Sequence, residues 1–114
     1  MSIDIENIKK EIVERLKPLN PQKIILFGSY AYGTPHKDSD IDLYVVTNDD
    51  FIPQSYREDS EIYKRVSRRI RDIRNMVAID LIVHTKEMYK KALEINQFFV
   101  SNVLENGVKL YEQN

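Results

Sequence analysis

The sequence of 114 residues contains no cysteine, which excludes disulfide bonds, thiolate nucleophiles and the usual cysteine-ligated zinc clusters. It also lacks any apolar run close to the ~20 residues that a membrane-spanning helix needs, and its first residues, MSIDIENIKKEI, do not resemble a secretion signal. The formal charge is only -1, so the chain as a whole has no strong attraction to nucleic acid or to an anionic membrane. We therefore expect a soluble cytoplasmic protein with no membrane partner, in which any electrostatic function is local.

The composition that is present, 42% hydrophobic and 31% charged residues, is ordinary for a globular protein, and the length predicts one domain over residues 1–114. The run over 76–83, MVAIDLIV, is typical of a central strand that is covered on both faces. Apolar spacing predicts helices over 3–16, 57–75, 97–106 and from Thr85 onward, and strands over 23–27, 41–47, 76–83 and a final VKLY. This order predicts an α/β (α+β) domain, with helices packed on a mixed β-sheet of about four strands.

Glycine is scarce, and two of the three glycines lie between the first two predicted strands, in LFGSYAYGTPHKDSDIDLYVV. A strand that ends at Gly28 and enters a short helix at Ser29 exposes backbone N–H groups, which together with the helix dipole favour an anion such as phosphate. Gly33 allows the chain to leave that helix in a conformation that other residues disfavour. A Gly-Ser pair is equally a good helix N-cap, so these residues alone do not establish a phosphate site.

Three aspartates add a second feature. Asp40 and Asp42 are two residues apart on a predicted strand, so their side chains point to one face with Cα atoms roughly 6.6 Å apart. Two carboxylates about 4 Å apart repel by ~4 kcal/mol at an effective dielectric constant near 20, unless water or a cation neutralises them. Magnesium suits such a pair, because it prefers carboxylates, waters and substrate phosphates. If the strands 41–47 and 77–83 are neighbours, Asp80 completes a triad that can hold two metal ions.

Each aspartate also has a structural interpretation. The sequence KDSD is a good turn, in which Asp40 can cap the loop, while Asp42 can be a solvated residue of an antiparallel strand and Asp80 can pair with an arginine. The occurrence of all three together with the Gly-Ser turn favours the metal site. We assign no catalytic role to His36, in the loop, or to His84, although His84 can lie near Asp80.

The motif as a whole, Gly28-Ser29, ten residues, Asp40-Ile41-Asp42 and then Asp80, resembles the minimal nucleotidyltransferase (MNT) family of the DNA polymerase beta-like nucleotidyltransferase superfamily. The resemblance covers nearly the whole chain and implies the polymerase beta-like nucleotidyltransferase fold. It also implies that Gly28 and Ser29 hold the β- and γ-phosphates of ATP, that Asp40 and Asp42 ligate two Mg2+ ions, and that Asp80 ligates the catalytic ion and helps to activate the acceptor hydroxyl.

One position departs from the family pattern. Many relatives have arginine where this chain has Tyr32, so a phosphate contact expected from that side chain is in doubt. Lys37, Arg68 and Arg69 are candidates to replace it, although the sequence does not place any of them in the site.

The resemblance further implies an antitoxin that transfers AMP from ATP to a tyrosine of a HEPN-domain toxin. Only 34 residues (114 minus 80) follow Asp80, too few for a second substrate-binding domain, so we expect the acceptor to come from a partner. Two alternatives stay open: a non-catalytic antitoxin that neutralises its partner by binding, and a free-standing nucleotidyltransferase that modifies a small molecule.

A basic helix raises a separate question about partners. Six basic residues occur within 63–74, namely Lys64, Arg65, Arg68, Arg69, Arg71 and Arg74. Such a face can bind an acidic partner or RNA phosphates. It can equally be a solvated surface neutralised by Glu58, Asp59 and Glu61, so direct nucleic-acid binding is undecided by the sequence.

Overall fold

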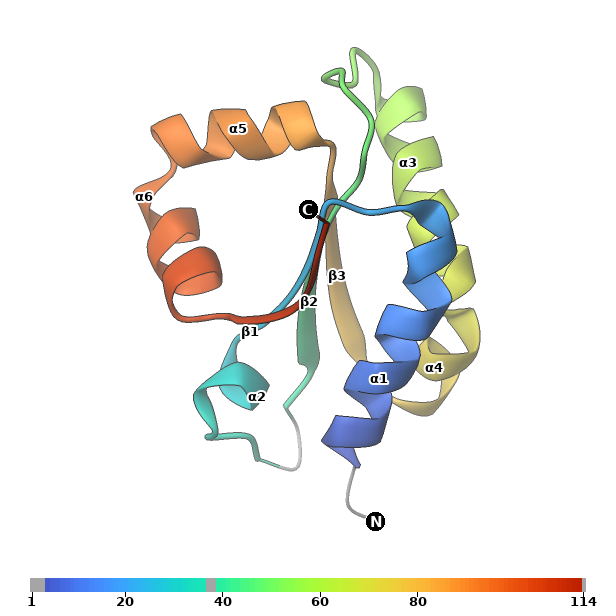
Figure 1. Ribbon diagram of the computed structural model, residues 1–114, viewed down its shortest axis with the longest axis vertical. Helices are drawn as coiled ribbons and strands as arrows, with labels where there is room; N and C mark the ends of the chain where they lie inside the picture. Colours follow the sequence, from blue (N-terminus) through green and yellow to red (C-terminus); the bar gives the residue numbers. More distant parts are fainter. Residues whose placement is uncertain (1–3, 37–38, 114) are drawn as a thin grey trace.

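The computed structural model describes residues 4–36 and 39–113 (Figure 1). A four-stranded sheet has the order β3-β2-β1-β4, in which β2 and β3 are parallel and the other pairs are antiparallel. The elements in chain order are α1 (Ile5–Leu16), the 3-10 helix η1 (Lys17–Leu19), β1 (Lys23–Phe27), α2 (Ser29–Tyr32), β2 (Ile41–Val46), α3 (Tyr56–Arg69), α4 (Arg71–Met76), β3 (Ile79–His84), α5 (Lys86–Ile95), α6 (Gln97–Phe99), the π-helix η2 (Val100–Glu105) and β4 (Val108–Glu112). The predicted α+β fold with a mixed four-stranded sheet is confirmed.

Helices cover both faces of the sheet (Figure 1). Helices α1, α3 and α4 lie on one face, against alternate residues of β2 such as Leu43 and Val45. The segment α5–α6–η2 lies on the other face, where Phe99 and Val103 pack against Tyr44. Because β2 is buried on both sides, its sequence is apolar at almost every position except its second residue.

Strand β3 is an edge strand, so the prediction that it is central and covered on both faces is wrong. Over residues 4–36 and 39–113 it pairs with β2 alone, and its buried residues alternate with exposed ones. Ile82 is 36% exposed, whereas Leu81 is 7% exposed. The strand also begins three residues later than predicted, because Met76 ends α4 and is 74% exposed. A short apolar run has the same appearance in both positions, which explains the error.

The helix predicted over 57–75 is divided in two. Ile70, with φ -116° and ψ 20°, leaves the helical region and separates α3 from α4. Both Ile70 and Ile73 are nevertheless buried, with exposed fractions of 0% and 1%. The apolar stripe therefore continues across the break, and the sequence pattern cannot reveal it. Across the described ranges of the chain, no helix has the length and apolar character needed to cross a membrane.

Gly107 connects η2 to β4 and provides a stability prediction. A Cβ atom there would lie 2.1 Å from the Val103 carbonyl oxygen and 2.8 Å from Ile25 Cγ2. Backbone and core must move to accommodate it, so we expect Gly107→Ala to destabilise the fold by about 1–3 kcal/mol. Thermal unfolding measures the change, with Asn106→Ala, at an exposed neighbouring position, as the control expected to stay within about 0.5 kcal/mol. Equal melting temperatures for the two variants would contradict the close contact.

Candidate active site

The candidate site lies at one edge of the sheet, where three strand ends meet. Strand β1 is antiparallel to β2, whereas β2 is parallel to β3. The carboxyl end of β1 therefore lies beside the amino ends of β2 and β3, and Phe27 pairs with Asp42 in register. This arrangement brings Gly28 and Ser29, which follow β1, to the same edge as Asp40, which precedes β2. Figure 1 shows α2 at the end of the sheet where β2 begins.

Asp42 and Asp80 are direct neighbours across the parallel pair β2–β3. Residues opposite each other on adjacent strands share one face, with backbones about 4.8 Å apart. Asp42 lies on the same face of β2 as Tyr44, the face that α5, α6 and η2 cover further along the strand. The prediction that these two strands are neighbours is confirmed.

The charges of the three aspartates interact. Burial raises the pKa of Asp42 above its usual value, and the negative charges of Asp80 and Asp40 raise it further. Asp40 and Asp80 are themselves exposed. The three carboxylates thus repel one another at this edge, with Asp42 as the most enclosed member.

Gly28 brings the turn after β1 against the carboxylate of Asp42. Its φ of 76° is in the region that favours glycine, and a Cβ atom would lie only 2.0 Å from Asp42 Oδ2. The Ala31 and Tyr32 amides donate to the Gly28 carbonyl at 3.0 and 3.1 Å, which starts α2 immediately after the glycine. Within the described part of the chain, no hydrogen bond engages the Ser29 hydroxyl. The turn therefore presents a free hydroxyl next to the acids.

Tyr32 has a role that the sequence did not suggest. Its hydroxyl donates to the Asn102 carbonyl at 3.0 Å and thereby ties α2 to η2. Of the residues considered as replacements for the family arginine, Arg68 and Arg69 lie on α3, which covers the opposite face of the sheet. Lys37 lies outside the described residues. The side chain at position 32 thus holds the short helix in place from its carboxyl end.

His84 is not part of the site. His84 Nδ1 lies 2.9 Å from the hydroxyl of Tyr44, and burial lowers the pKa of His84. His84 is four positions beyond Asp80 along the strand, which is about 13 Å, so the idea that His84 lies near Asp80 is wrong. His36 is exposed, and its amide donates to Ser39 Oγ at 2.9 Å.

The aspartate carboxylates at this edge suit magnesium, although they do not form a complete coordination site by themselves. Among the described residues, no three His, Cys, Asp or Glu side chains are grouped closely enough to hold a metal ion as they stand. Magnesium, however, needs only one or two protein carboxylates, and waters and phosphates complete its octahedron. A cation would also relieve the repulsion that raises the pKa of Asp42. Asp40, Asp42 and Asp80 are therefore suited to hold it, together with a bound triphosphate.

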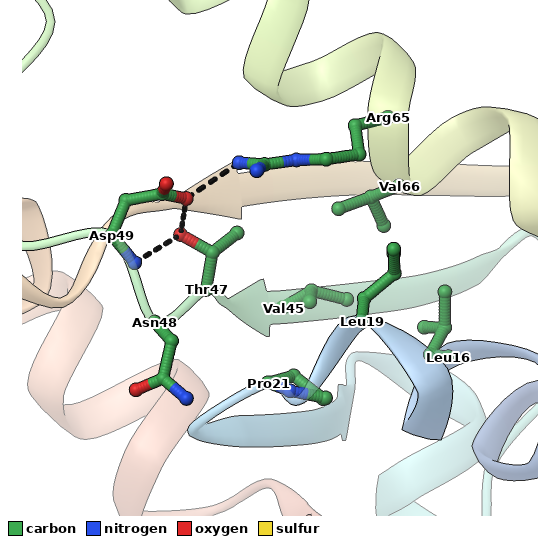
Figure 2. A pocket seen from close by; sticks show the side chains of 9 residues that line it. All are labelled: Leu16, Leu19, Pro21, Val45, Thr47, Asn48, Asp49, Arg65 and Val66. Carbon is green, nitrogen blue, oxygen red and sulfur yellow. Dashed lines mark hydrogen bonds and ion pairs between the residues drawn. The ribbon is translucent and has the colours of Figure 1, made fainter.

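A well-formed pocket of about 160 Å³ lies elsewhere (Figure 2). It includes Val45 and Thr47, at the far end of β2 from Asp42, and none of the five candidate site residues lines it. Asp49 also lines the pocket, and its Oδ2 atom accepts hydrogen bonds from Arg65 and Thr47, at 2.5 and 2.6 Å. Burial alone would raise the pKa of Asp49, but these two hydrogen bonds lower it overall. The pocket is therefore bordered by a structural ion pair and is separate from the candidate site.

The raised pKa of Asp42 predicts how stability depends on pH without metal. Because its folded-state pKa exceeds the unfolded value of about 3.9, the metal-free fold loses stability as the pH rises from that value through the folded-state pKa. We expect Asp42→Asn to remove this loss and to stabilise the metal-free protein at pH 7. The gain should stay below about 1 kcal/mol, because solvent screens the partly exposed carboxylate. Thermal unfolding in EDTA from pH 3 to 8 measures it, and a difference between variants that does not change with pH would contradict the prediction.

Comparisons with known proteins agree with this arrangement. The chain matches the family described as "Nucleotidyltransferase domain" over residues 5–111. It is 36% identical over 109 residues to "Putative protein adenylyltransferase MJ0604" of Methanocaldococcus jannaschii, an alignment that covers 93% of this chain and 97% of the relative.

Two solved structures are similar in fold. One, a toxin-antitoxin with AMP-PNP, is 23% identical with a TM-score of 0.55 and covers 93% of this chain and 74% of that chain. The other, a tri-AMPylated Shewanella oneidensis HEPN toxin in complex with MNT antitoxin, is 18% identical with a TM-score of 0.52 and covers 95% of this chain and 72% of that chain. At these identities the likeness establishes the fold alone. Because the family match spans nearly the whole chain, including every residue of the candidate site, the chain belongs to the nucleotidyltransferase domain family.

Proposed function

We propose that this chain transfers AMP from ATP, with Mg2+, to a tyrosine hydroxyl of a HEPN-domain toxin and acts as its antitoxin. The observation that carries the proposal is the pairing of Asp42 with Asp80 in register, directly beside the positive-φ turn at Gly28. The similarity to a putative protein adenylyltransferase and to an MNT antitoxin in complex with an AMPylated HEPN toxin supports adenylyl transfer and a HEPN partner.

Each site residue has a role in this reaction. The backbone and hydroxyl of Ser29, at the start of α2, bind the β- and γ-phosphates, and Gly28 keeps space for them beside Asp42. Asp40, Asp42 and Asp80 would hold the magnesium ions. When bound, two such ions supply electrostatic stabilisation of the charge that develops on the attacking and departing oxygens.

The chemistry is an in-line displacement at the α-phosphorus. The acceptor oxygen forms a bond to that phosphorus while the bond to the β-phosphate oxygen breaks, and pyrophosphate leaves with the bonding electrons. Asp80 is exposed on an edge strand, so its carboxylate can accept the proton of an approaching hydroxyl. The carboxylates and the turn thus orient the triphosphate, while the acceptor enters from the open side.

The exposure of the outer side of strand β3 supports a macromolecular acceptor. Within the described residues, strand β3 has no neighbouring strand on its outer side, and both Asp80 and Ile82 are exposed on it. A tyrosine on the surface of a folded protein can therefore reach Asp80 without entering an enclosed cavity.

Two radiolabelled forms of ATP test the proposal. The chain is incubated with Mg2+ and the purified product of the adjacent gene, using ATP labelled at either the α- or the γ-phosphate. We expect transfer of the α-label alone to the partner, at a tyrosine identified by mass spectrometry. Tight binding with no transfer of either label would favour neutralisation by masking, and transfer to a small molecule in place of the protein would favour a free-standing enzyme.

A further inference from the structure

A group of arginines lies outside the candidate active site, where α1 meets the junction of α3 and α4. These side chains line an open hollow of about 530 Å³ that we call the arginine hollow. Its lining residues are Arg15, Arg68, Arg69, Arg71, Asp72 and Asn75. Four positive charges and one negative charge give it a net charge of +3, although the whole chain has a net charge of -1. The arginine hollow is therefore strongly positive, although the net charge of the whole chain does not reveal it.

Two of these arginines are fixed in place by the fold. Arg69 Nε donates to the Arg15 carbonyl at 3.0 Å, which links α3 to α1. Arg15 in turn forms an ion pair with Asp72 of α4. Because Arg15 and Arg69 are already held, a ligand in the hollow loses less side-chain entropy on binding.

The other two, Arg68 and Arg71, are available to a ligand. Among the described residues, no hydrogen bond or ion pair engages either guanidinium group. The acids expected to neutralise this helix, Glu58, Asp59 and Glu61, lie in the first half of α3 instead. There, Glu61 Oε1 lies 3.7 Å from Arg57 Nε. The interpretation of these arginines as a surface neutralised along the helix is therefore not supported for Arg68 and Arg71.

Other basic residues of the same helices serve the fold. Arg65 bonds to Asp49, while Arg74 donates to the Tyr63 hydroxyl at 3.0 Å and to Ser67 Oγ at 2.7 Å. The arginines that line the hollow are thus a distinct subset of the basic helix.

The hollow is also separate from the candidate active site. Helices α1, α3 and α4 cover one face of the sheet, whereas Asp42 lies on the face covered by α5, α6 and η2 (Figure 1). A ligand in the hollow would therefore leave the edge with the three aspartates open.

We propose that the arginine hollow binds the phosphodiester backbone of a nucleic acid. Every residue that lines it is charged or an amide, so it lacks the apolar core that protein–protein interfaces need. Nucleic-acid interfaces are instead polar and strongly positive, and most of their hydrogen bonds go to phosphate and sugar. The planar guanidinium group matches a phosphate with two parallel hydrogen bonds. In this geometry Arg68 and Arg71, three residues apart on the surface, contact successive phosphates while Arg15 and Arg69 supply fixed positive charge.

Fluorescence anisotropy at increasing salt concentrations tests the proposal. The probes are a labelled 20-nucleotide single-stranded RNA, a duplex DNA of the same length and a labelled polyglutamate peptide, and the proteins are the wild type, the double variant Arg68→Gln/Arg71→Gln, and the control Lys90→Gln/Lys91→Gln. The control removes the same charge from exposed positions of α5, on the opposite face of the sheet.

We expect RNA or duplex DNA to bind, with log K falling linearly with log salt. Loss of two phosphate contacts should weaken binding at least tenfold and reduce the slope by about 1.4 for single strands or about 1.8 for duplex, whereas the control changes neither. The arm that binds more tightly identifies RNA or DNA as the source of the phosphates. The proposal is overturned if neither nucleic acid binds at 50 mM salt, if polyglutamate binds as tightly as nucleic acid, or if the control weakens binding as much as the arginine variant.

Discussion

Asp42→Asn is expected to reduce AMP transfer to the proposed HEPN-domain partner by at least about 1,000-fold. Asp42 is the most enclosed of the three carboxylates and lies between its two acidic neighbours, so its charge is the one that a cation compensates most directly. Magnesium contributes several kcal/mol of transition-state stabilisation in such sites, and ~4 kcal/mol corresponds to about a thousandfold in rate. Transfer of α-labelled AMP, followed as an initial rate at saturating ATP, measures the effect.

Asp50→Asn is a matched control for that substitution. It removes one carboxylate from an exposed position beyond the opposite end of β2, so it should leave transfer unchanged. Partner binding measured by size-exclusion chromatography should be the same for both variants. If Asp42→Asn retained more than a tenth of the wild-type rate, the assignment of Asp42 to the reaction would be wrong, and normal neutralisation of the toxin by that variant would support masking.

Gly28→Ala is the second substitution with a large expected effect. Its Cβ atom would lie 2.0 Å from Asp42 Oδ2, at a residue with φ 76°. With a ψ of -160°, this backbone conformation is one that essentially only glycine adopts and costs an alanine roughly 1–3 kcal/mol, and the overlap must in addition displace the Asp42 carboxylate or the turn. We expect AMP transfer to fall by at least about 100-fold, since such a loss corresponds to about 2.7 kcal/mol of misplaced catalytic contact.

Gly33→Ala is a control that adds a Cβ atom at a positive φ without the contact to Asp42. Gly33 has a φ of 77°, nearly equal to that of Gly28, but an added Cβ atom there has no neighbour within 4 Å among the described residues. Gly33 has a ψ of 20°, in the left-handed helical region, whereas Gly28 has a ψ of -160°, so Gly33→Ala bears the smaller backbone strain and only Gly28→Ala disturbs Asp42. We expect Gly33→Ala to lose less thermal stability than Gly28→Ala and to keep a much higher transfer rate. Equal transfer rates would show that the contact between the turn and the carboxylate does not matter for the reaction.

The sequence predicted which strands are neighbours better than it predicted the edges of the sheet. The spacing from Gly28 to Asp42 predicted the turn between the first two strands, and the three aspartates led to the hypothesis that the strands with Asp42 and Asp80 are neighbours, which the structure confirms. The sequence could not show that Asp42 and Asp80 pair in register, since register depends on packing between distant segments.

Other features depended on contacts that a single sequence does not encode locally. An apolar run cannot tell an edge strand from a central one, so β3 was misplaced, and the break at Ile70 was hidden because Ile70 and Ile73 are both buried. The bond from Tyr32 to Asn102 joins segments 70 residues apart and had no signal at all.

The most direct measurement is a crystal structure of the wild-type protein soaked with manganese and a non-hydrolysable ATP analogue. Manganese replaces magnesium in oxygen-ligand sites and has a strong anomalous signal, so its position can be read independently of the rest of the density. We predict anomalous peaks between the carboxylates of Asp40, Asp42 and Asp80, with the β- and γ-phosphates on the turn at Gly28 and Ser29. Manganese and nucleotide bound at another place, with these three aspartates bearing neither, would contradict the assignment of the active site.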